Sequence, residues 1–363
     1  SVGSQPDGGS WLDAIGREWH TSLDGSDWCV AAELDSLYIG GGTPSLLGPD
    51  VMAELRQILG KERLGHPDLE WTGEANPESI DAEVVRGWRQ AGVTRVSLGI
   101  QSYHEPTLRW MGRLHGPEGA DEAIARLLSA GFRSVTADLI FGLPASLGRD
   151  WQGDLERLTD SGVPHISLYG LTVEPGTPLA RAVSEGRTAA VDEVQYEDEY
   201  LEASERLVEA GYEHYEVSSF AKPGHRAVHN QKYWNGSPYL GLGNGAHSFL
   251  PPTRSWNVRA WPDYLARIRE GADAVAETEE IAGEKARLEE LWLGLRRTEG
   301  LPVSAVDAEH IARWCKKGHA EVTDGRVSLT ALGWLLLDQL VVDASSSPPP
   351  YSSGPGPEFA RTG

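Results

Sequence analysis

Apolar and polar positions along the chain alternate between two patterns. Short runs rich in β-branched and aromatic residues predict strands over residues 36–40, 69–75, 95–102, 134–142, 165–173 and 214–220. Between them, apolar residues recur three and four positions apart, which predicts helices, for example over residues 80–91, 120–130 and 195–210. A glycine follows Ala91, Ala130 and Ala210, where a helix C-cap is expected. Strand–helix alternation about every 30 residues predicts βαβ units and a parallel sheet, either doubly wound or a barrel.

The pattern changes after residue 227. The segment HNQKYWNGSPYLGLGNGAHSF is rich in Gly, Asn and aromatic residues and has no clear period. Helices are expected over residues 279–297 and 303–317, followed by a strand, an Asp-Gly turn, a strand and a helix. This order predicts a winged-helix-like part within a mixed C-terminal domain. We therefore expect one domain over residues 1–226, a second over 227–343, and a disordered Pro-, Ser- and Gly-rich tail over 344–363.

Charge and cysteine content narrow the partners and the compartment. The chain has 363 residues and a formal net charge of −22, which disfavours nucleic acid and anionic lipid as partners and gives the winged-helix-like part a structural role. The two cysteines, Cys29 and Cys315, make no disulfide framework and fit a reducing cytoplasm. No apolar run approaches the roughly 20 residues that span a bilayer. Because the chain starts without Met and in loop-like residues, we expect a fragment that begins inside a domain.

Polar residues and glycines gather where the predicted strands end. They are Gly40 to Thr43, Glu74 with Asn76, Gln101 and Asp138. Because parallel strands place their carboxyl ends at one edge of a sheet, and ligands of α/β folds bind there, this edge is the candidate site. Asp138 is the most telling member, since a carboxylate within an apolar strand is costly unless it is paired or bound.

The three glycines of LYIGGGTPSLL admit two interpretations. The motif is not a P-loop, because no Lys-Ser or Lys-Thr pair follows it, and it is not a GxGxxG dinucleotide loop. It is either a strand-to-helix turn, for which one glycine would serve, or a bare backbone that a ligand approaches.

Other candidates also have structural alternatives. Glu74 stands before a helix-start sequence, and Arg113 is equally explained as a surface arginine. His229 and His247 lie among aromatic residues, where a histidine is either packed and hydrogen-bonded or a ligand for the metal of a flat macrocycle. The sequence contains no GxSxG, CxxC or HExxH motif.

Taken together, these motifs resemble one known family. YIGGGTPSLL, EANPE, RVSLGIQSYHEPTLRWMGRLH, DLIFGLP, HISLYGLTVEPGTPL, YEVSSFA and HNQKYW with YLGLGNGAHS are similar to the HemN/HemW branch of the radical S-adenosylmethionine (SAM) superfamily, from about Trp11 to about Leu340. The HNxxYW segment and the segment LYGLTVEPGTPL resemble the heme chaperones of that branch more than its oxygen-independent coproporphyrinogen III oxidases.

The resemblance implies a fold, ligands and site residues. The fold is a partial, open TIM-like barrel, here without its first strand, followed by the C-terminal domain. The ligands are SAM and heme, the partner is a heme-receiving protein, and the location is cytoplasmic, with peripheral membrane contact left open. By match of motif, the SAM-binding residues are Gly41, Gly42, Thr43, Glu74, Gln101, Arg113 and Asp138. His229 is the candidate heme residue.

One departure from the family concerns its [4Fe–4S] cluster. The family holds this cluster on a CxxxCxxC loop, which the chain lacks, so the two cysteines present cannot bind it and no metal-ligating residues are assigned. We expect either a truncated family member or a cluster-less, non-catalytic paralogue. The hypotheses are a heme chaperone, an oxidative decarboxylase of coproporphyrinogen III, and that paralogue.

Overall fold

A computed structural model describes residues 8–23, 28, 30–31, 33–189 and 191–345. It divides into two compact units, Ser1–Ile281 and Ala282–Gly363, and each is described by itself. The predicted boundary at residues 226 and 227 stays a prediction. Of the predicted tail, Ala344 and Ser345 end a helix, and the remainder lies outside the described residues.

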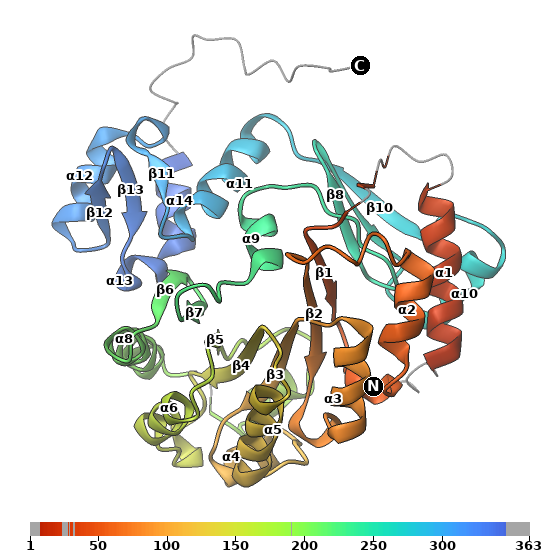
Figure 1. Cartoon of the computed structure of the whole chain (residues 1–363). Coiled ribbons are helices and arrows are strands. Elements are labelled where there is room, and N and C mark those ends of the chain that lie inside the picture. The colour runs from red at the N-terminus through yellow and green to blue at the C-terminus, as the bar shows by residue number, and fades with distance from the viewer. Residues whose placement is uncertain (1–7, 24–27, 29, 32, 190, 346–363) are drawn as a thin grey trace. The chain divides into compact units, whose positions relative to one another are not determined.

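The first unit is built on a seven-stranded sheet that curls into a half-barrel (Figure 1). Its strands are β1 (Ser36–Ile39), β2 (Glu70–Ala75), β3 (Arg95–Gln101), β4 (Ser134–Phe141), β5 (His165–Gly170), β6 (Glu213–Glu216) and β7 (Ser219–Ala221). Strands β1 to β5 are parallel and adjacent in chain order, whereas β7 runs antiparallel to both β5 and β6. The expected partial barrel of parallel strands is therefore confirmed.

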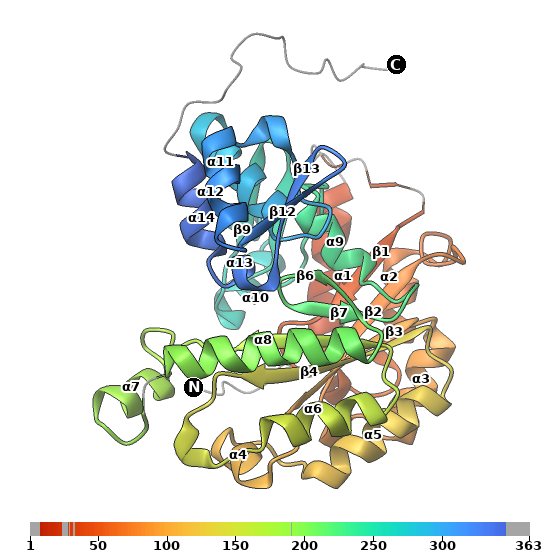
Figure 2. The ribbon, with the colours of Figure 1, turned by 90° about the vertical axis from the view of Figure 1, so that its left-hand side faces the viewer.

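Helices cover the outer face of this sheet. In Figure 1, α3, α5, α6 and α8 lie around the outside of the curled strands, and Figure 2 shows these helices from the side of α8. The helices of the unit are α1 (Gly8–Leu23), α2 (Val51–Leu59), α3 (Ala82–Ala91), α4 (Glu105–Trp110), α5 (Pro117–Ser129), α6 (Trp151–Asp160), α7 (Pro178–Ser184), α8 (Glu193–Glu209), α9 (Val228–Trp234) and α10 (Trp261–Arg269). Short 3₁₀ turns lie at Pro44–Leu47, Pro77–Ser79 and Ala145–Leu147. The glycines expected at C-caps, Gly92, Gly131 and Gly211, all have positive φ.

The two faces of the sheet differ in chemistry because successive side chains in a strand point to opposite sides. On the helix-covered face lie apolar residues that are almost fully buried, including Leu98, Val135 and Leu139. The inner face carries polar residues in nearly every strand. They are Tyr38, Glu70, Thr72, Glu74, Arg95, Ser97, Ser134, Thr136, Asp138, His165, Ser167 and Tyr169. The inner face of the half-barrel is therefore suited to a polar ligand and not to packing against an apolar core.

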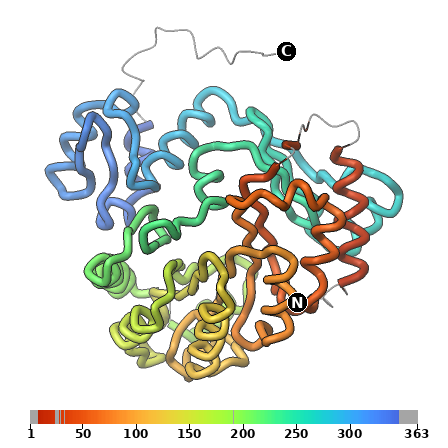
Figure 3. Tube along the Cα trace, in the orientation of Figure 1, coloured from red at the N-terminus to blue at the C-terminus, as the bar shows by residue number. Residues whose placement is uncertain are grey.

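The rest of the first unit contains a second, antiparallel sheet, β10 (Val275–Glu280), β9 (Thr253–Asn257) and β8 (His247–Leu250). Helices α1 and α10 pack together beside it (Figure 3). The buried carboxylate of Glu18 in α1 accepts hydrogen bonds from Tyr264 Oη (2.6 Å), Asn257 Nδ2 (2.5 Å) and Gly243 N (2.7 Å). One side chain therefore holds the N-terminal helix to three later segments.

The second unit contains helices and a three-stranded sheet of order β11-β13-β12. Its elements are α11 (Gly283–Leu295), β11 (Leu301–Pro302), a 3₁₀ turn at Val303–Ala305, α12 (Ala308–Lys316), β12 (Ala320–Thr323), β13 (Arg326–Leu329), α13 (Ala331–Trp334) and α14 (Leu337–Ser345). The expected hairpin is present, with Asp324 and Gly325 at its turn, both at positive φ. The order of helices and hairpin agrees with the winged-helix-like prediction.

Several elements differ in detail from those expected. The strand predicted over residues 214–220 is a tight hairpin, because β6 and β7 pair antiparallel with two residues between them. The strand predicted to reach residue 173 ends at Gly170. The segment without a clear period after residue 227 contains α9 and β8, whose short lengths leave too few repeats to reveal a period.

Candidate functional site

Glu74 is the centre of the carboxyl edge of the sheet. Its Oε1 accepts a hydrogen bond from Tyr38 Oη at 2.6 Å, and its Oε2 accepts one from Gly41 N at 3.1 Å. The carboxylate at the end of β2 therefore fixes the glycine turn that follows β1. The predicted residues Gly41 and Glu74 are brought together directly.

The three glycines of the triplet differ in whether the turn requires a glycine at that position. A Cβ on Gly40 would lie 2.5 Å from Glu74 Oε1 and 2.6 Å from Tyr38 Cε1, so a side chain there would displace Glu74 and Tyr38. Gly41 has a φ of 87°, a backbone conformation that L side chains rarely adopt. A Cβ on Gly42 would meet nothing within 4 Å. The turn accounts for the first two glycines and leaves Gly42 without such a reason, and the space beside both Gly41 and Gly42 is open.

Asn76 gathers the second group of predicted residues. Its Nδ2 donates to Thr43 Oγ1 at 3.2 Å, and its Oδ1 accepts from Nη1 of Arg113 at 3.1 Å. Gln101 lies beside it at the end of β3, with an unusual φ of 67°. Arg113 is therefore part of this edge and not only a surface arginine.

Asp138 faces the same interior from the middle of β4 and not from the strand end, where it was expected, because β4 continues to Phe141. Its carboxylate accepts hydrogen bonds from Ser97 Oγ, at 3.0 Å and 3.3 Å to its two oxygens, and from Ser167. Burial raises the pKa of Asp138 from 3.8 to about 7, the two serines oppose this, and the nearby charge of Glu74 adds to it. Within the described residues neither Glu74 nor Asp138 forms an ion pair. Among the described residues, the cation of the interior that acts on Asp138 is Arg95, and its ion pair is with Glu70 rather than with Glu74 or Asp138.

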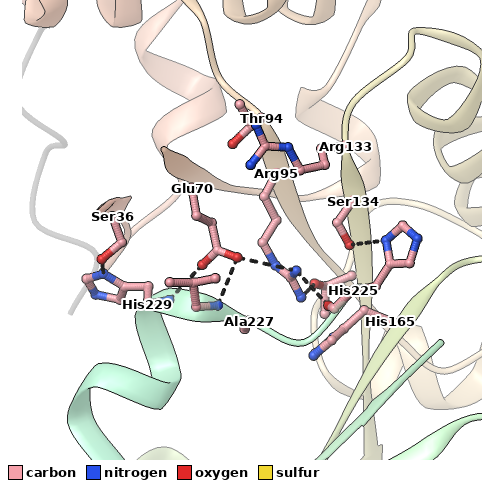
Figure 4. Close-up of polar contacts among 12 residues, drawn as sticks. Ser36, Glu70, Thr94, Arg95, Arg133, Ser134, His165, His225, Ala227 and His229 are labelled. Atoms are coloured by element: carbon pink, nitrogen blue, oxygen red, sulfur yellow. Dashed lines mark hydrogen bonds and ion pairs between the residues drawn. The ribbon is translucent and has the colours of Figure 1, made fainter. Parts of the chain in front are cut away.

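The segment that leads into α9 lies against the amino ends of β2 and β3 (Figure 4). The buried carboxylate of Glu70 accepts hydrogen bonds from the backbone N–H groups of Val228 (2.9 Å) and His229 (2.8 Å). Arg95 lies 3.7 Å from Glu70 and donates to the carbonyl oxygen of His225 at 3.0 Å. These contacts occupy the amino ends of β2 and β3, whereas the predicted residues gather toward the carboxyl edge.

His229 stands beside these contacts with both ring nitrogens engaged. Nδ1 lies 2.9 Å from Ser36 Oγ, and Nε2 lies 2.8 Å from Tyr233 Oη. The ring stacks on Tyr38 with centroids 5.0 Å apart, and burial lowers the pKa of His229 to about 4, so the imidazole is neutral at pH 7. Coordination of heme iron by His229 would have to replace one of these two hydrogen bonds. His247 is exposed and stacks on Trp256.

Sequence reasoning missed three polar residues of the interior, Tyr38, Ser97 and Ser167. A signal for them was available. Tyr38 precedes Gly40 by two positions, and Ser97 and Ser167 occupy the same side of β3 and β5 as Asp138 does in β4. Applying the two-residue period to all strands together would have identified this face.

The described part of the chain contains no group of three or more His, Cys, Asp or Glu side chains that could hold a metal ion. Cys315 is an exposed free cysteine on α12, and Cys29 lies outside the described residues. No helix among the described residues is both long and apolar enough to cross a membrane.

The chain is similar to several known proteins. A family model described as Radical SAM superfamily matches residues 27–158. The heme chaperone HemW of Mycobacterium tuberculosis is 37% identical over 343 residues, which cover 93% of this chain and 86% of that protein. The heme chaperone HemW of Bacillus subtilis is 32% identical over 270 residues, covering 74% and 71%.

Among solved structures, the coproporphyrinogen III oxidase HemN of Escherichia coli, described as a radical SAM enzyme, superposes with a TM-score of 0.75. The superposition covers 93% of this chain and 83% of that one at 20% sequence identity. At this identity the likeness concerns the fold.

Proposed function

Because this chain belongs to the HemN/HemW branch of the radical SAM superfamily, we propose that it is a HemW-like heme chaperone. In this role it binds heme, carries SAM at the carboxyl edge of the half-barrel, and passes heme to a recipient protein in the cytoplasm. The relatives that support the proposal are named heme chaperones and match most of the chain.

The observation that carries the SAM part of the proposal is the unpaired charge in the interior. Glu74 and Asp138 point into one polar space without an ion-pair partner among the described residues. A cationic ligand lowers the cost of holding both carboxylates there. SAM carries an ammonium and a sulfonium, which suit these carboxylates, and its own carboxylate suits the guanidinium of Arg113.

The remaining predicted residues fit the same ligand. Gly41, Gly42 and Thr43 would border its methionine end, since Gly42 leaves the backbone open to an approaching group. Gln101 offers an amide beside Asn76. Bound SAM supplies radical chemistry in this superfamily, and that chemistry needs an electron donor.

The residues of this chain do not fit the iron–sulfur cluster. A [4Fe–4S] cluster of the radical SAM type needs three thiolates from the protein, and the sequence contains two cysteines that are far apart. No step is therefore assigned to a cluster. The alternative function, oxidative decarboxylation of coproporphyrinogen III, depends on such a cluster and has the weaker support, because the likeness to HemN concerns the fold.

Heme binding is proposed for the aromatic region around α9. Tyr233 contacts His229 and Tyr239 edge-on, with ring centroids 4.9 Å and 4.6 Å apart, and Phe249 pairs with Tyr239 across a β-bridge. Aromatic faces of this kind suit a flat macrocycle, and His229 offers a nitrogen ligand once Tyr233 or Ser36 releases it.

The experiment is a titration of the purified full chain with hemin, followed by the Soret band. A saturable shift is expected for the wild-type chain, and it should weaken in His229→Ala. His247→Ala is the matched control, because it removes a histidine that also stacks on an aromatic ring but lies on β8.

Transfer is tested by mixing the loaded chain with an apo-form heme protein and measuring its absorbance. The chaperone proposal is refuted if no saturable shift occurs, or if the loaded chain transfers no heme to the apo-protein.

A further inference from the structure

The end of β3 contains a strained turn that the proposed SAM site uses. Ser102 N donates to the carbonyl oxygen of Ile100 at 2.8 Å, which closes a three-residue γ-turn around Gln101. Gln101 has a φ of 67°, and a γ-turn of this hand is rare and strained. Among the described residues, Asp324 is the other non-glycine residue with positive φ, and its place in a hairpin turn explains it. Gln101 has no such local explanation.

The turn directs the side chain of Gln101 back over β3. Its Nε2 lies 2.5 Å from the point where a Cβ on Gly99 would stand, and Asn76 Oδ1 lies 3.1 Å from that same point. The missing side chain at Gly99 therefore leaves room for the amide beside Asn76. Since Asn76 also bonds Thr43 and Arg113, the strained turn places a polar group within the predicted site.

Strain of this kind persists only where the surroundings hold it. Asp154 of α6 does so from one side, since Oδ2 accepts from Ser102 Oγ at 2.7 Å and Oδ1 accepts from Tyr103 N at 3.1 Å. His115 holds the other side, with Nε2 3.1 Å from the carbonyl oxygen of Ile100. Asp154 is 4% exposed and Ser102 is fully buried, so water does not compete for these bonds.

We propose that Asp154 is a positioning residue for SAM binding. It holds the γ-turn in the conformation that places the amide of Gln101 at the site. Its own carboxylate accepts hydrogen bonds from Ser102 and Tyr103. This inference rests on the proposed SAM binding by this chain. It predicts that Asp154 affects SAM affinity only through Gln101.

Glu199 provides a matched control within the same network. The buried guanidinium of Arg149 lies 4.0 Å from Asp154 and 2.6 Å from Glu199. Glu199 differs from Asp154 in that it accepts from the backbone N–H of Gly142, after β4, and does not touch the γ-turn. Glu199→Gln therefore disturbs the same arginine without releasing Gln101.

The test is calorimetric titration of the full chain with SAM in a double-mutant cycle. In Asp154→Ala we expect about tenfold weaker affinity, as for the loss of one or two hydrogen bonds, and a similar loss in Gln101→Gly. The double variant should match Gln101→Gly within about twofold. Asp154→Asn, which still accepts from Tyr103 N, should stay within about threefold of the wild-type affinity. Glu199→Gln should bind SAM as the wild-type chain does.

A second measurement does not depend on SAM. In a chain labelled with ¹⁵N-glutamine, the side-chain amide signal of Gln101, assigned by its loss in Gln101→Gly, should shift and broaden in Asp154→Ala and not in Glu199→Gln. Circular dichroism identifies any variant that fails to fold. If Asp154→Ala is one of them, Ser102→Ala, which removes the hydrogen bond to Asp154 Oδ2, carries the test and should weaken SAM binding in the wild-type background but not in Gln101→Gly.

The outcomes separate the two proposals. If the wild-type chain binds SAM and Asp154→Ala weakens binding equally in both backgrounds, the positioning role is overturned and SAM binding stands. If the wild-type chain does not bind SAM, the proposed SAM site fails, and a changed amide signal leaves Asp154 as the residue that holds the turn. An unchanged amide signal in Asp154→Ala overturns the positioning role in either case.

Discussion

Replacement of Asp138 by Asn should make the ligand-free protein more stable at alkaline pH. The carboxyl group has a pKa raised from 3.8 to about 7, mainly by burial, so the fold disfavours its ionised form. The stability that Asp138 contributes is therefore fully present below about pH 4 and is lost as the pH rises through 7. Asn cannot ionise, and its carbonyl oxygen can still accept the hydrogen bond from Ser97.

The size of the effect follows from the shift. A pKa raised from 3.8 to about 7 corresponds to a cost of about 4 kcal/mol for holding the ionised carboxylate in the fold. Proton linkage predicts that this cost increases by about 2–3 kcal/mol between pH 5 and pH 8.

The assay is urea unfolding of the wild-type chain and of Asp138→Asn at pH 5 and pH 8, followed by circular dichroism. The free energy of unfolding of the variant should exceed that of the wild type by about 2–3 kcal/mol more at pH 8 than at pH 5. An equal difference at both pH values would refute the reasoning, because Asp138 would then ionise as easily in the fold as in the unfolded chain. The same variant should bind SAM more weakly, since one of the two unpaired carboxylates is lost.

Three further predictions concern other carboxylates. Glu74→Ala should weaken SAM binding in calorimetry by about tenfold or more, and unchanged affinity in both this variant and an Asp138→Ala variant would remove the SAM assignment. Glu70→Ala should lower the free energy of unfolding by about 3–5 kcal/mol, because it leaves the buried charge of Arg95 unpaired, and a loss below about 1 kcal/mol in urea unfolding would contradict this. Glu18→Gln should lower the free energy of unfolding by about 1–3 kcal/mol, since an amide nitrogen replaces one of two oxygens that accept from three donors. Because burial raises the pKa of Glu18, the deficit of this variant should shrink as the pH rises from 4 to 8, and a deficit that grows would count against it.

The sequence predicted the sheet well because the signal is local. Five of the predicted strands, from the run before the glycine triplet to the run that begins at His165, appear within a few residues of their expected bounds. Each is bounded by a glycine or a polar residue, and a helix follows before the next strand. The hairpin of β6 and β7 was not predicted, because its turn has two residues and lacks an Asn-Gly or Asp-Gly pair.

The candidate site was predicted in part. The polar residues at strand ends were identified because parallel strands end at one edge, which is a property of topology rather than of side-chain packing. Their partners depend on packing between strands that are distant in the chain, such as Tyr38 on Glu74 and Ser97 on Asp138. No local sequence pattern predicts which side chains form such hydrogen-bonded pairs.

The sequence by itself determined the strand and helix order, the edge at which polar groups gather, the acidic charge and the family resemblance, since each depends on residue type and spacing along the chain. The tertiary structure decided what each residue does there. It assigned Gly40 and Gly41 to the turn, gave both nitrogens of His229 partners, and placed Asp154 against the turn at Gln101. These contacts join segments tens of residues apart, and their distances are set by how the whole half-barrel packs.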